Sequence, residues 1–180
     1  SLQNQKNYMS TDKNHRIVFI GGHQRTLKTF KALLLRNDVK IILFIIQKDY
    51  ENEFQYYIEL ENLAKKHHIP YETYESAKRL RPETIKKIKD IAPDVILRGG
   101  NWRAILPTTI WSTSRYGCIC LHGSALPEYR GWAGINWHII NGEKYYGLQM
   151  FKFNENIDDG DLVCRNDGSP ISTTISLDNN

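Results

Sequence analysis

The sequence has few cysteines and no long apolar run, and each shortage excludes a class of protein. Only three of the 180 residues are cysteine, and Cys118, Cys120 and Cys164 do not have the spacing of paired zinc ligands. The first residues do not resemble a secretory leader, so three cysteines favour a reducing compartment over a disulfide scaffold. No apolar run approaches the ~20 residues that a membrane-spanning helix needs. We therefore expect a cytoplasmic protein with neither a metal nor a membrane partner.

Extremes of charge and composition are also missing. The net charge is only +4, and the lysines and arginines are spread over predicted helices, which favours solvated surfaces over a nucleic-acid track. The hydrophobic share of 41% and the charged share of 24% are typical of a globular protein. A chain of 180 residues suits one domain and is short for two. We expect a flexible leader over 1–14, one domain over 15–180 and no nucleic-acid partner.

Apolar runs typical of buried strands alternate with segments of helical periodicity. The expected strands are 16–20, 39–46, 71–74, 95–97, 145–153 and 163–171, together with the run that starts at Cys118. The expected helices are one capped by Thr26, one within 51–68, one opened by Pro82 and one within 132–142. This alternation predicts an α/β fold of three layers, with a mostly parallel, twisted sheet and helices on both faces.

The turn after the first strand begins with Gly21 and Gly22. It lacks the spacing of a dinucleotide fingerprint or a phosphate-binding Walker loop, so neither NAD nor ATP is indicated. Two interpretations stay open. The turn is a tight strand-to-helix connection, or its backbone N–H groups and Arg25 meet a substrate phosphate at a helix N-terminus.

Two motifs carry the chemistry. Residues 118–131 read Cys-Ile-Cys-Leu-His-Gly-Ser-Ala-Leu-Pro-Glu-Tyr-Arg-Gly, and residues 156–163 read Asn-Ile-Asp-Asp-Gly-Asp-Leu-Val. The first begins as a strand and ends at His122 in a polar loop, and ligands bind at such carboxyl ends of strands in open α/β sheets. Two motifs in one register are more specific than either motif alone.

The pair of motifs resembles the signature of formyltransferases that use N10-formyltetrahydrofolate. The resemblance implies a Rossmann-like formyltransferase fold for residues 15–180. Members of the family usually continue with a further helix and many add a C-terminal domain, and we expect this chain to lack such an extension. It also implies that His122 and Asp158 are catalytic, so we expect them within hydrogen-bond reach, or one water apart, at the carboxyl edge of the sheet. In the family an asparagine usually stands two residues before the histidine and helps to bind the formyl oxygen. Cys120 occupies that place here, so we count it as the third catalytic position.

The resemblance also implies the binding residues. In the family the loop that corresponds to residues 98–107 lines the pterin pocket. The expected folate contacts are Gly100, Asn101, Trp102, Arg103, Ile105, Ile157 and Asp161. The expected acceptor contacts are Gly22, Arg25, Tyr129, Arg130 and Trp132. For Trp102 ordinary core packing is the alternative interpretation.

The function implied is transfer of a formyl group from N10-formyltetrahydrofolate to a primary amine. A nucleotide-linked amino sugar is the preferred acceptor, because the weak positive charge argues against methionylated tRNA. Glycinamide ribonucleotide as acceptor, hydrolysis of the formyl folate, and a folate- or nucleotide-binding module without turnover stay open, as does a homodimer. A covalent route through the Cys120 thiol is a further alternative.

Overall fold

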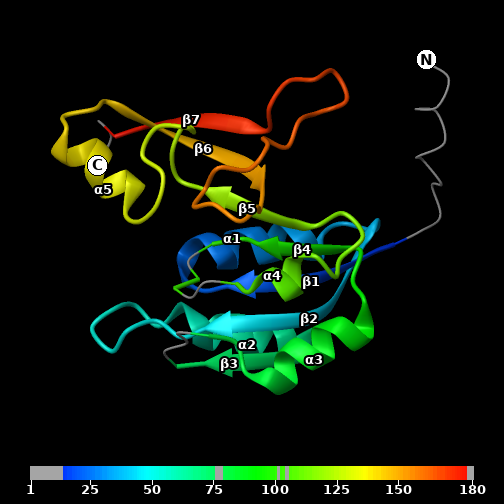
Figure 1. The fold of residues 1–180 in the computed structure, drawn as a ribbon. Helices are drawn as coiled ribbons and strands as arrows, with labels where there is room; N and C mark the ends of the chain where they lie inside the picture. Colours follow the sequence, from blue (N-terminus) through cyan, green and yellow to red (C-terminus); the bar gives the residue numbers. More distant parts are fainter. Residues whose placement is uncertain (1–13, 76–78, 101, 104–105, 178–180) are drawn as a thin grey trace, which may run out of the picture.

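A computed structural model describes residues 14–75, 79–100, 102–103 and 106–177. The expected leader, apart from Asn14, and the candidate folate contacts Asn101 and Ile105 lie outside the described residues. The chain forms one seven-stranded sheet in the order β3-β2-β1-β4-β5-β6-β7 (Figure 1).

The sheet is parallel over its first five strands and antiparallel over its last two. The parallel strands are β1 (His15–Gly21), β2 (Val39–Gln47), β3 (Tyr71–Tyr74), β4 (Val95–Arg98) and β5 (Cys118–His122). The antiparallel strands are β6 (Tyr145–Lys152) and β7 (Ser172–Ser176). The prediction of a mostly parallel α/β sheet is confirmed.

Helices cover both faces of this sheet (Figure 1). On one face lie α1 (His23–Leu34) and α2 (Tyr56–Lys66), and on the other lie α3 (Pro82–Ile91) and α4 (Thr108–Trp111). The short α5 (Gly134–Ile140) lies beside β6. The three expected layers are therefore present.

The core has one apolar cluster on each face, because parallel strands are buried on both sides. On the α1/α2 face, Phe19, Phe30 and Phe44 are fully buried, and the ring centroids of Phe19 and Phe44 lie 4.9 Å apart. Burial of each such side chain contributes roughly 1.5–3 kcal/mol. These clusters fix the central strands and thereby the carboxyl edge at which polar loops gather.

Two local predictions are wrong. Thr26 does not cap α1: the helix begins at His23, and the Thr26 hydroxyl donates a hydrogen bond to the Gly22 carbonyl at 2.6 Å. The last strand is 172–176 rather than 163–171. Residues before it make only isolated bridges, because the chain turns at 166–168 and Cys164 pairs with Pro170.

Within the part of the chain that the structure describes, every helix is too short or too polar to span a bilayer.

Candidate active site

The candidate catalytic residues come from the end of β5 and from the loop after β6. β5 delivers Cys120 and His122 to the same face of the sheet, because side chains alternate along a strand. Asp158 follows β6 in a turn that folds back on the strand, where the Lys152 N–H donates to the Asp161 carbonyl at 2.8 Å. A side chain at Gly160 would clash with the Lys152 carbonyl, 1.6 Å from its Cβ. The glycine in Asp-Asp-Gly is therefore needed to bring Asp158 to the sheet.

His122 and Asp158 are in contact. Nδ1 of His122 lies 3.4 Å from Oδ2 of Asp158, and each side chain is 11% exposed. The same carboxylate oxygen accepts the Gly131 N–H at 2.9 Å. The expected proximity of these two residues is thus present in the structure.

The second nitrogen of His122 is also engaged. Nε2 lies 3.1 Å from the Tyr129 carbonyl oxygen, and the ring meets Phe151 edge to face at 6.2 Å. Both ring nitrogens therefore face oxygen acceptors, and a ring that carries two protons satisfies both contacts. Because Tyr129 and Gly131 belong to the loop after β5, the loop and the His122–Asp158 pair hold each other in place.

Cys120 lies beside Arg98. The two residues are neighbours in the parallel pairing of β4 with β5, and Nη1 of Arg98 lies 3.6 Å from the Cys120 sulfur. Burial raises the pKa of the Cys120 thiol, and the opposing effect of the Arg98 charge does not cancel it. Cys120 is therefore a neutral thiol near neutral pH, which argues against the covalent route.

The turn at Gly22 and Arg25 is a tight one. A side chain at Gly22 would lie 2.5 Å from the Gln47 carbonyl, so this glycine is needed for the contact between α1 and the end of β2. Arg25 points toward the β5 loop, since a Cβ at Gly123 would lie 3.3 Å from Arg25 Nη2. Burial lowers the pKa of Arg25. The tight-turn interpretation agrees with the structure, and the phosphate contact stays a prediction.

The described part of the 98–107 loop packs mainly against the protein itself. Trp102 is 2% exposed, and its ring meets Tyr74 edge to face at 5.7 Å, so the indole forms part of the core rather than the wall of an open pocket. A side chain at Gly100 would lie 2.3 Å from the Thr26 hydroxyl oxygen. Ile157 is 74% exposed and Asp161 is exposed. The folate contacts at these positions stay predictions.

The candidate acceptor residues Tyr129, Arg130 and Trp132 lie in the loop after β5. The Tyr129 ring lies against His138 at a centroid distance of 3.8 Å with the two rings tilted. It lines a cleft of about 630 Å³ together with Glu128, Glu143 and Tyr146. Arg130 pairs with Asp159 at 2.5 Å, and Trp132 is 72% exposed. Their contact with an acceptor stays a prediction.

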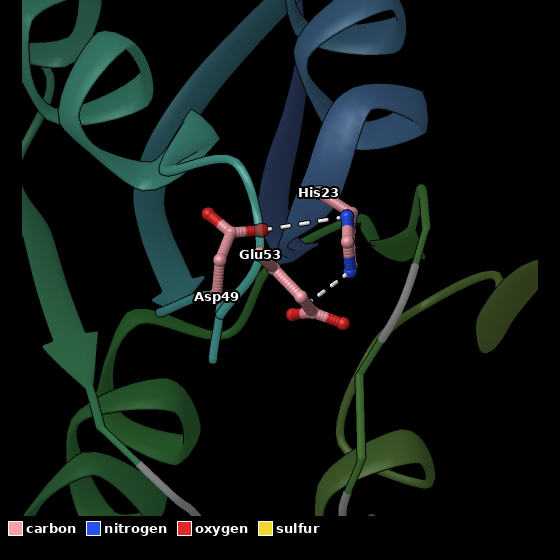
Figure 2. Close-up of side chains that lie close together, drawn as sticks. All are labelled: His23, Asp49 and Glu53. Atoms are coloured by element: carbon pink, nitrogen blue, oxygen red, sulfur yellow. Dashed lines mark ion pairs between the residues drawn. The ribbon is translucent and has the colours of Figure 1, made fainter. Parts of the chain in front are cut away.

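A second histidine cluster, which the sequence analysis missed, lies at the ends of β1 and β2. His23 sits between two carboxylates, with Nδ1 3.4 Å from Asp49 and Nε2 3.3 Å from Glu53 (Figure 2). The signal was an aspartate just after a buried strand and a histidine just after a Gly-Gly turn. Neither residue belongs to the two motifs, so the sequence did not single them out.

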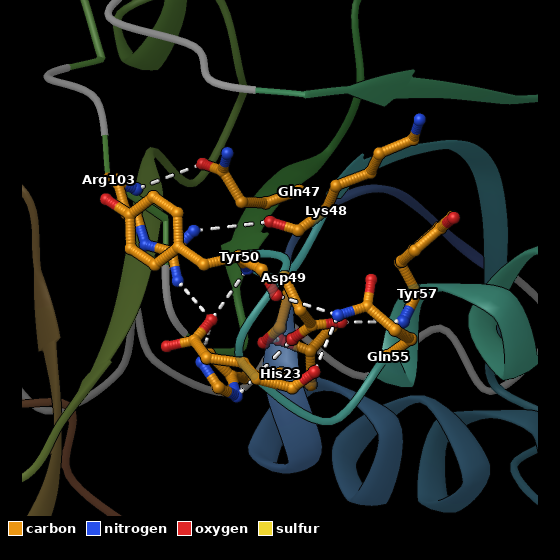
Figure 3. A network of polar contacts seen from close by, with 11 residues as sticks. His23, Gln47, Lys48, Asp49, Tyr50, Gln55, Tyr57 and Arg103 are labelled. Carbon is orange, nitrogen blue, oxygen red and sulfur yellow. Dashed lines mark hydrogen bonds and ion pairs between the residues drawn. The ribbon is translucent and has the colours of Figure 1, made fainter.

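Arg103 ties this cluster to the loop after β4 (Figure 3). Its guanidinium donates to Glu53 Oε2 at 2.8 Å and to the Lys48 carbonyl at 3.2 Å, and it lies 3.6 Å from the centre of the Tyr50 ring. Arg103 therefore holds the β2–α2 connection against the carboxyl edge.

The His23 cluster is the group in the described residues with the composition of a metal site. One ligand atom each from His23, Asp49 and Glu53 lies within 4.8 Å of the others. The Glu53 oxygen that faces His23 already accepts from Arg103 and from the Tyr50 N–H at 2.8 Å, and a guanidinium repels a nearby cation. The pairing of Glu53 with Arg103 therefore disfavours a cation at this cluster.

The comparison with known families settles the relationship. Residues 15–175 match the family model described as formyl transferase. The chain belongs to the formyl transferase family. The family that the resemblance implied is thus confirmed.

The relatives and structural neighbours of this chain are named for different reactions. A methionyl-tRNA formyltransferase of Citrifermentans bemidjiense is 32% identical over 91% of this chain and 49% of its own length. A phosphoribosylglycinamide formyltransferase of Anaplasma phagocytophilum has a TM-score of 0.69 at 17% identity, over 92% of this chain and 74% of its own. A formyltetrahydrofolate deformylase of Pseudomonas syringae pv. tomato has a TM-score of 0.69 at 16% identity, over 93% of this chain and 53% of its own. The two structural likenesses show the shared fold.

The chain spans about half the length of the curated relatives that it matches. The expectation that no nucleic acid takes part conflicts with relatives named for methionyl-tRNA, and it is withdrawn. Its physical basis was the mild charge of +4. That value describes only the present residues and says nothing of surfaces in the uncovered half of the relatives.

Proposed function

We propose that this chain transfers the formyl group of N10-formyltetrahydrofolate to a primary amine. The observation that carries the proposal is the 3.4 Å contact between His122 and Asp158 at the carboxyl edge of the sheet, in a member of the formyl transferase family. Formyl transfer needs an aligned amine, stabilisation of the oxyanion that forms on the formyl carbon, and removal of a proton from the amine.

His122 is suited to the last two tasks. A histidine side chain exchanges protons near neutral pH, and a doubly protonated ring can donate to the developing oxyanion. Asp158 holds Nδ1, so Nε2 is the nitrogen that can exchange its contact with the Tyr129 carbonyl for one with a substrate. Asp158 thus orients the ring and stabilises its charge while Nε2 meets the reacting atoms.

The buried Trp102 ring limits how the folate donor is held. If the pterin lies along the loop after β4, Trp102 can contribute its main chain but not its ring face, because that face is inside the core. Arg103 is likewise committed to Glu53 and Tyr50. The described part of the loop therefore fits a folate whose pterin edge forms hydrogen bonds with main-chain groups.

Two acceptors deserve comparison. The exposed Trp132 and the nearby Arg130 offer aromatic and cationic contacts to a nucleotide-linked amino sugar, which we keep as the small-molecule acceptor. The names of the relatives favour methionyl-tRNA.

The three free cysteines suit the reducing cytoplasm, in which we propose that the protein works.

The test is an acceptor panel. The purified chain is incubated with N10-formyltetrahydrofolate and, in separate reactions, methionyl-tRNA, nucleotide-linked amino sugars, glycinamide ribonucleotide or no amine. Tetrahydrofolate release and the mass of the formylated acceptor are measured, with His122→Gln as the control. Folate binding without release under any condition would identify a non-catalytic module, and formate release without an amine would identify a hydrolase. Either result would overturn the proposed transfer.

A further inference from the structure

Arg25 and Arg98 are two cations near the candidate catalytic pair that have no anionic partner in the part of the chain that the structure describes. Among the described residues, no carboxylate lies within ion-pair distance of either guanidinium; the carboxylates nearby pair with His122, Arg130 or the His23 cluster. The charges of both arginines act to lower the pKa of the Cys120 thiol, and the charge of Arg98 acts to lower the pKa of Arg25. Two partly buried like charges side by side are unfavourable unless an anion joins them.

Arg98 is the better placed of the two. One arm of its guanidinium, Nη2, donates to the Trp102 carbonyl at 2.8 Å, which fixes its direction. The other arm, Nη1, lies 3.6 Å from the Cys120 sulfur. Its Nε is buried and makes no hydrogen bond within the described structure. A thiol is a poor partner for an arginine, so this guanidinium has donor capacity that the protein does not use.

The Arg98 guanidinium lies beside the position that the family's asparagine usually occupies. Arg98 and Cys120 are direct neighbours across β4 and β5, and His122 follows two residues later on the same face. The amide of the family's usual asparagine would stand where the Cys120 sulfur stands. The Arg98 guanidinium therefore lies within contact distance of the place from which the formyl oxygen would be bound.

We propose that Arg98 is a catalytic residue of this chain, donating to the oxyanion on the formyl carbon in place of the asparagine amide that Cys120 does not provide. This inference rests on the proposed formyl transfer. When the amine nitrogen bonds to the formyl carbon, the C=O π electrons move to the oxygen, and Arg98 stabilises that charge without giving up a proton. As the carbon–N10 bond breaks, the electrons return to the carbonyl, N10 gains a proton, and the amine loses one.

The first experiment is a rescue cycle with four proteins: wild type, Arg98→Met, Cys120→Asn and the double variant. Arg98→Met should lower kcat by about 100- to 1000-fold, the usual cost of one oxyanion donor, with a much smaller change in KM. Cys120→Asn alone should change kcat little, because Arg98 already donates. Cys120→Asn in the Arg98→Met background should restore most of the lost kcat.

The rescue separates catalysis from structure. If Arg98 only anchors the Trp102 carbonyl, an amide at position 120 cannot replace it, and the double variant should stay as slow as Arg98→Met. That result would overturn the inference, as would a large gain in kcat from Cys120→Asn alone. The exposed Arg115→Met is the matched control for loss of an arginine and should leave kcat unchanged.

A binding measurement keeps this inference distinct from the proposed function. The probe is a folate analogue that carries a hydrated ketone at the formyl position and so imitates the tetrahedral intermediate; the reference is the same analogue without that group. Arg98→Met should weaken the probe by roughly 10- to 100-fold and leave the reference unchanged. If wild type does not turn over yet shows this selective loss, formyl transfer fails and the oxyanion site stands. Equal effects on both compounds, or no binding of either, would refute the role of Arg98.

Discussion

Two histidine clusters at the same edge of the sheet use similar residues to different ends. His23 follows β1 and has a carboxylate near each ring nitrogen, and Arg103 pairs with one of these carboxylates. His122 ends β5 and contacts one carboxylate and one main-chain carbonyl. The guanidinium of Arg98, which pairs with no carboxylate among the described residues, lies beside Cys120 on the neighbouring strand. In the first cluster each side chain contacts another member of the cluster. In the second cluster, Nε2 of His122 contacts a main-chain carbonyl that a substrate can replace, and Arg98 has hydrogen-bond donors that the described part of the protein does not use. A site that stabilises a developing oxyanion requires such free donors.

The largest difference should appear when each histidine is removed. His122→Gln should lower kcat for formyl transfer by about 10²- to 10⁴-fold, because it removes the proton donor and acceptor, whereas His23→Gln should leave kcat nearly unchanged. Tetrahydrofolate release measures kcat, and circular dichroism confirms folding. Comparable losses of kcat in the two variants would contradict a structural role for the His23 cluster and a catalytic role for the His122 cluster alone.

A smaller loss should follow from removing the charge next to His122. Asp158→Asn keeps an oxygen for the Gly131 N–H but no longer stabilises a charged ring, so kcat should fall by on the order of 100-fold with little change in KM. Steady-state kinetics measure both values. Asp167→Asn, in an exposed turn, is the control. A drop confined to substrate affinity would assign Asp158 to binding.

The His23 cluster should show its role in stability. The Asp49 side chain is fully buried, accepts the Tyr57 N–H at 2.9 Å and faces the His23 ring. Asp49→Asn keeps the shape and removes the charge, and we expect the free energy of unfolding to fall by about 1–3 kcal/mol. Urea unfolding measures this change. Asp38→Asn, from the surface pair with Arg36, should lose far less, and an equal loss would contradict the structural role of Asp49.

The smallest expected effect concerns acid stability. Burial acts to raise the pKa of Glu53, but the Tyr50 N–H, Arg103 and His23 outweigh it and hold the pKa below its usual value. A carboxyl group with a lowered folded-state pKa stabilises the protein above the unfolded-state value of about 4.3, and this contribution is lost as the pH falls through the folded-state pKa. Wild type should therefore lose stability below about pH 4.3, and Glu53→Gln should lose less over that range.

Unfolding curves at several pH values test this slope, with the exposed Glu155→Gln as the control. Identical pH dependence in wild type and Glu53→Gln would mean that the contacts of Glu53 with Arg103 and the Tyr50 N–H do not stabilise its charged form.

Much of the fold could be predicted because its signals are local. The continuous apolar run at 39–46 and the central run at 95–97 predicted buried strands, and Pro82 opened a helix as expected. The last strand could not be placed, because 172–176 is polar and its pairing with β6 is decided by the turn before it rather than by its own residues.

The sequence by itself indicated the His122–Asp158 pair, since the two motifs carry the family resemblance and the Asp-Asp-Gly turn supplies the glycine that lets Asp158 reach the sheet. Only the tertiary structure decided the neighbours of that pair. Arg98 meets Cys120 because β4 and β5 pair in one register, and Trp102 enters the core because Tyr74 lies beside it. The His23 cluster likewise joins the ends of β1 and β2 with the loop after β4. Such contacts depend on long-range strand pairing, and no local pattern of residues specifies that pairing.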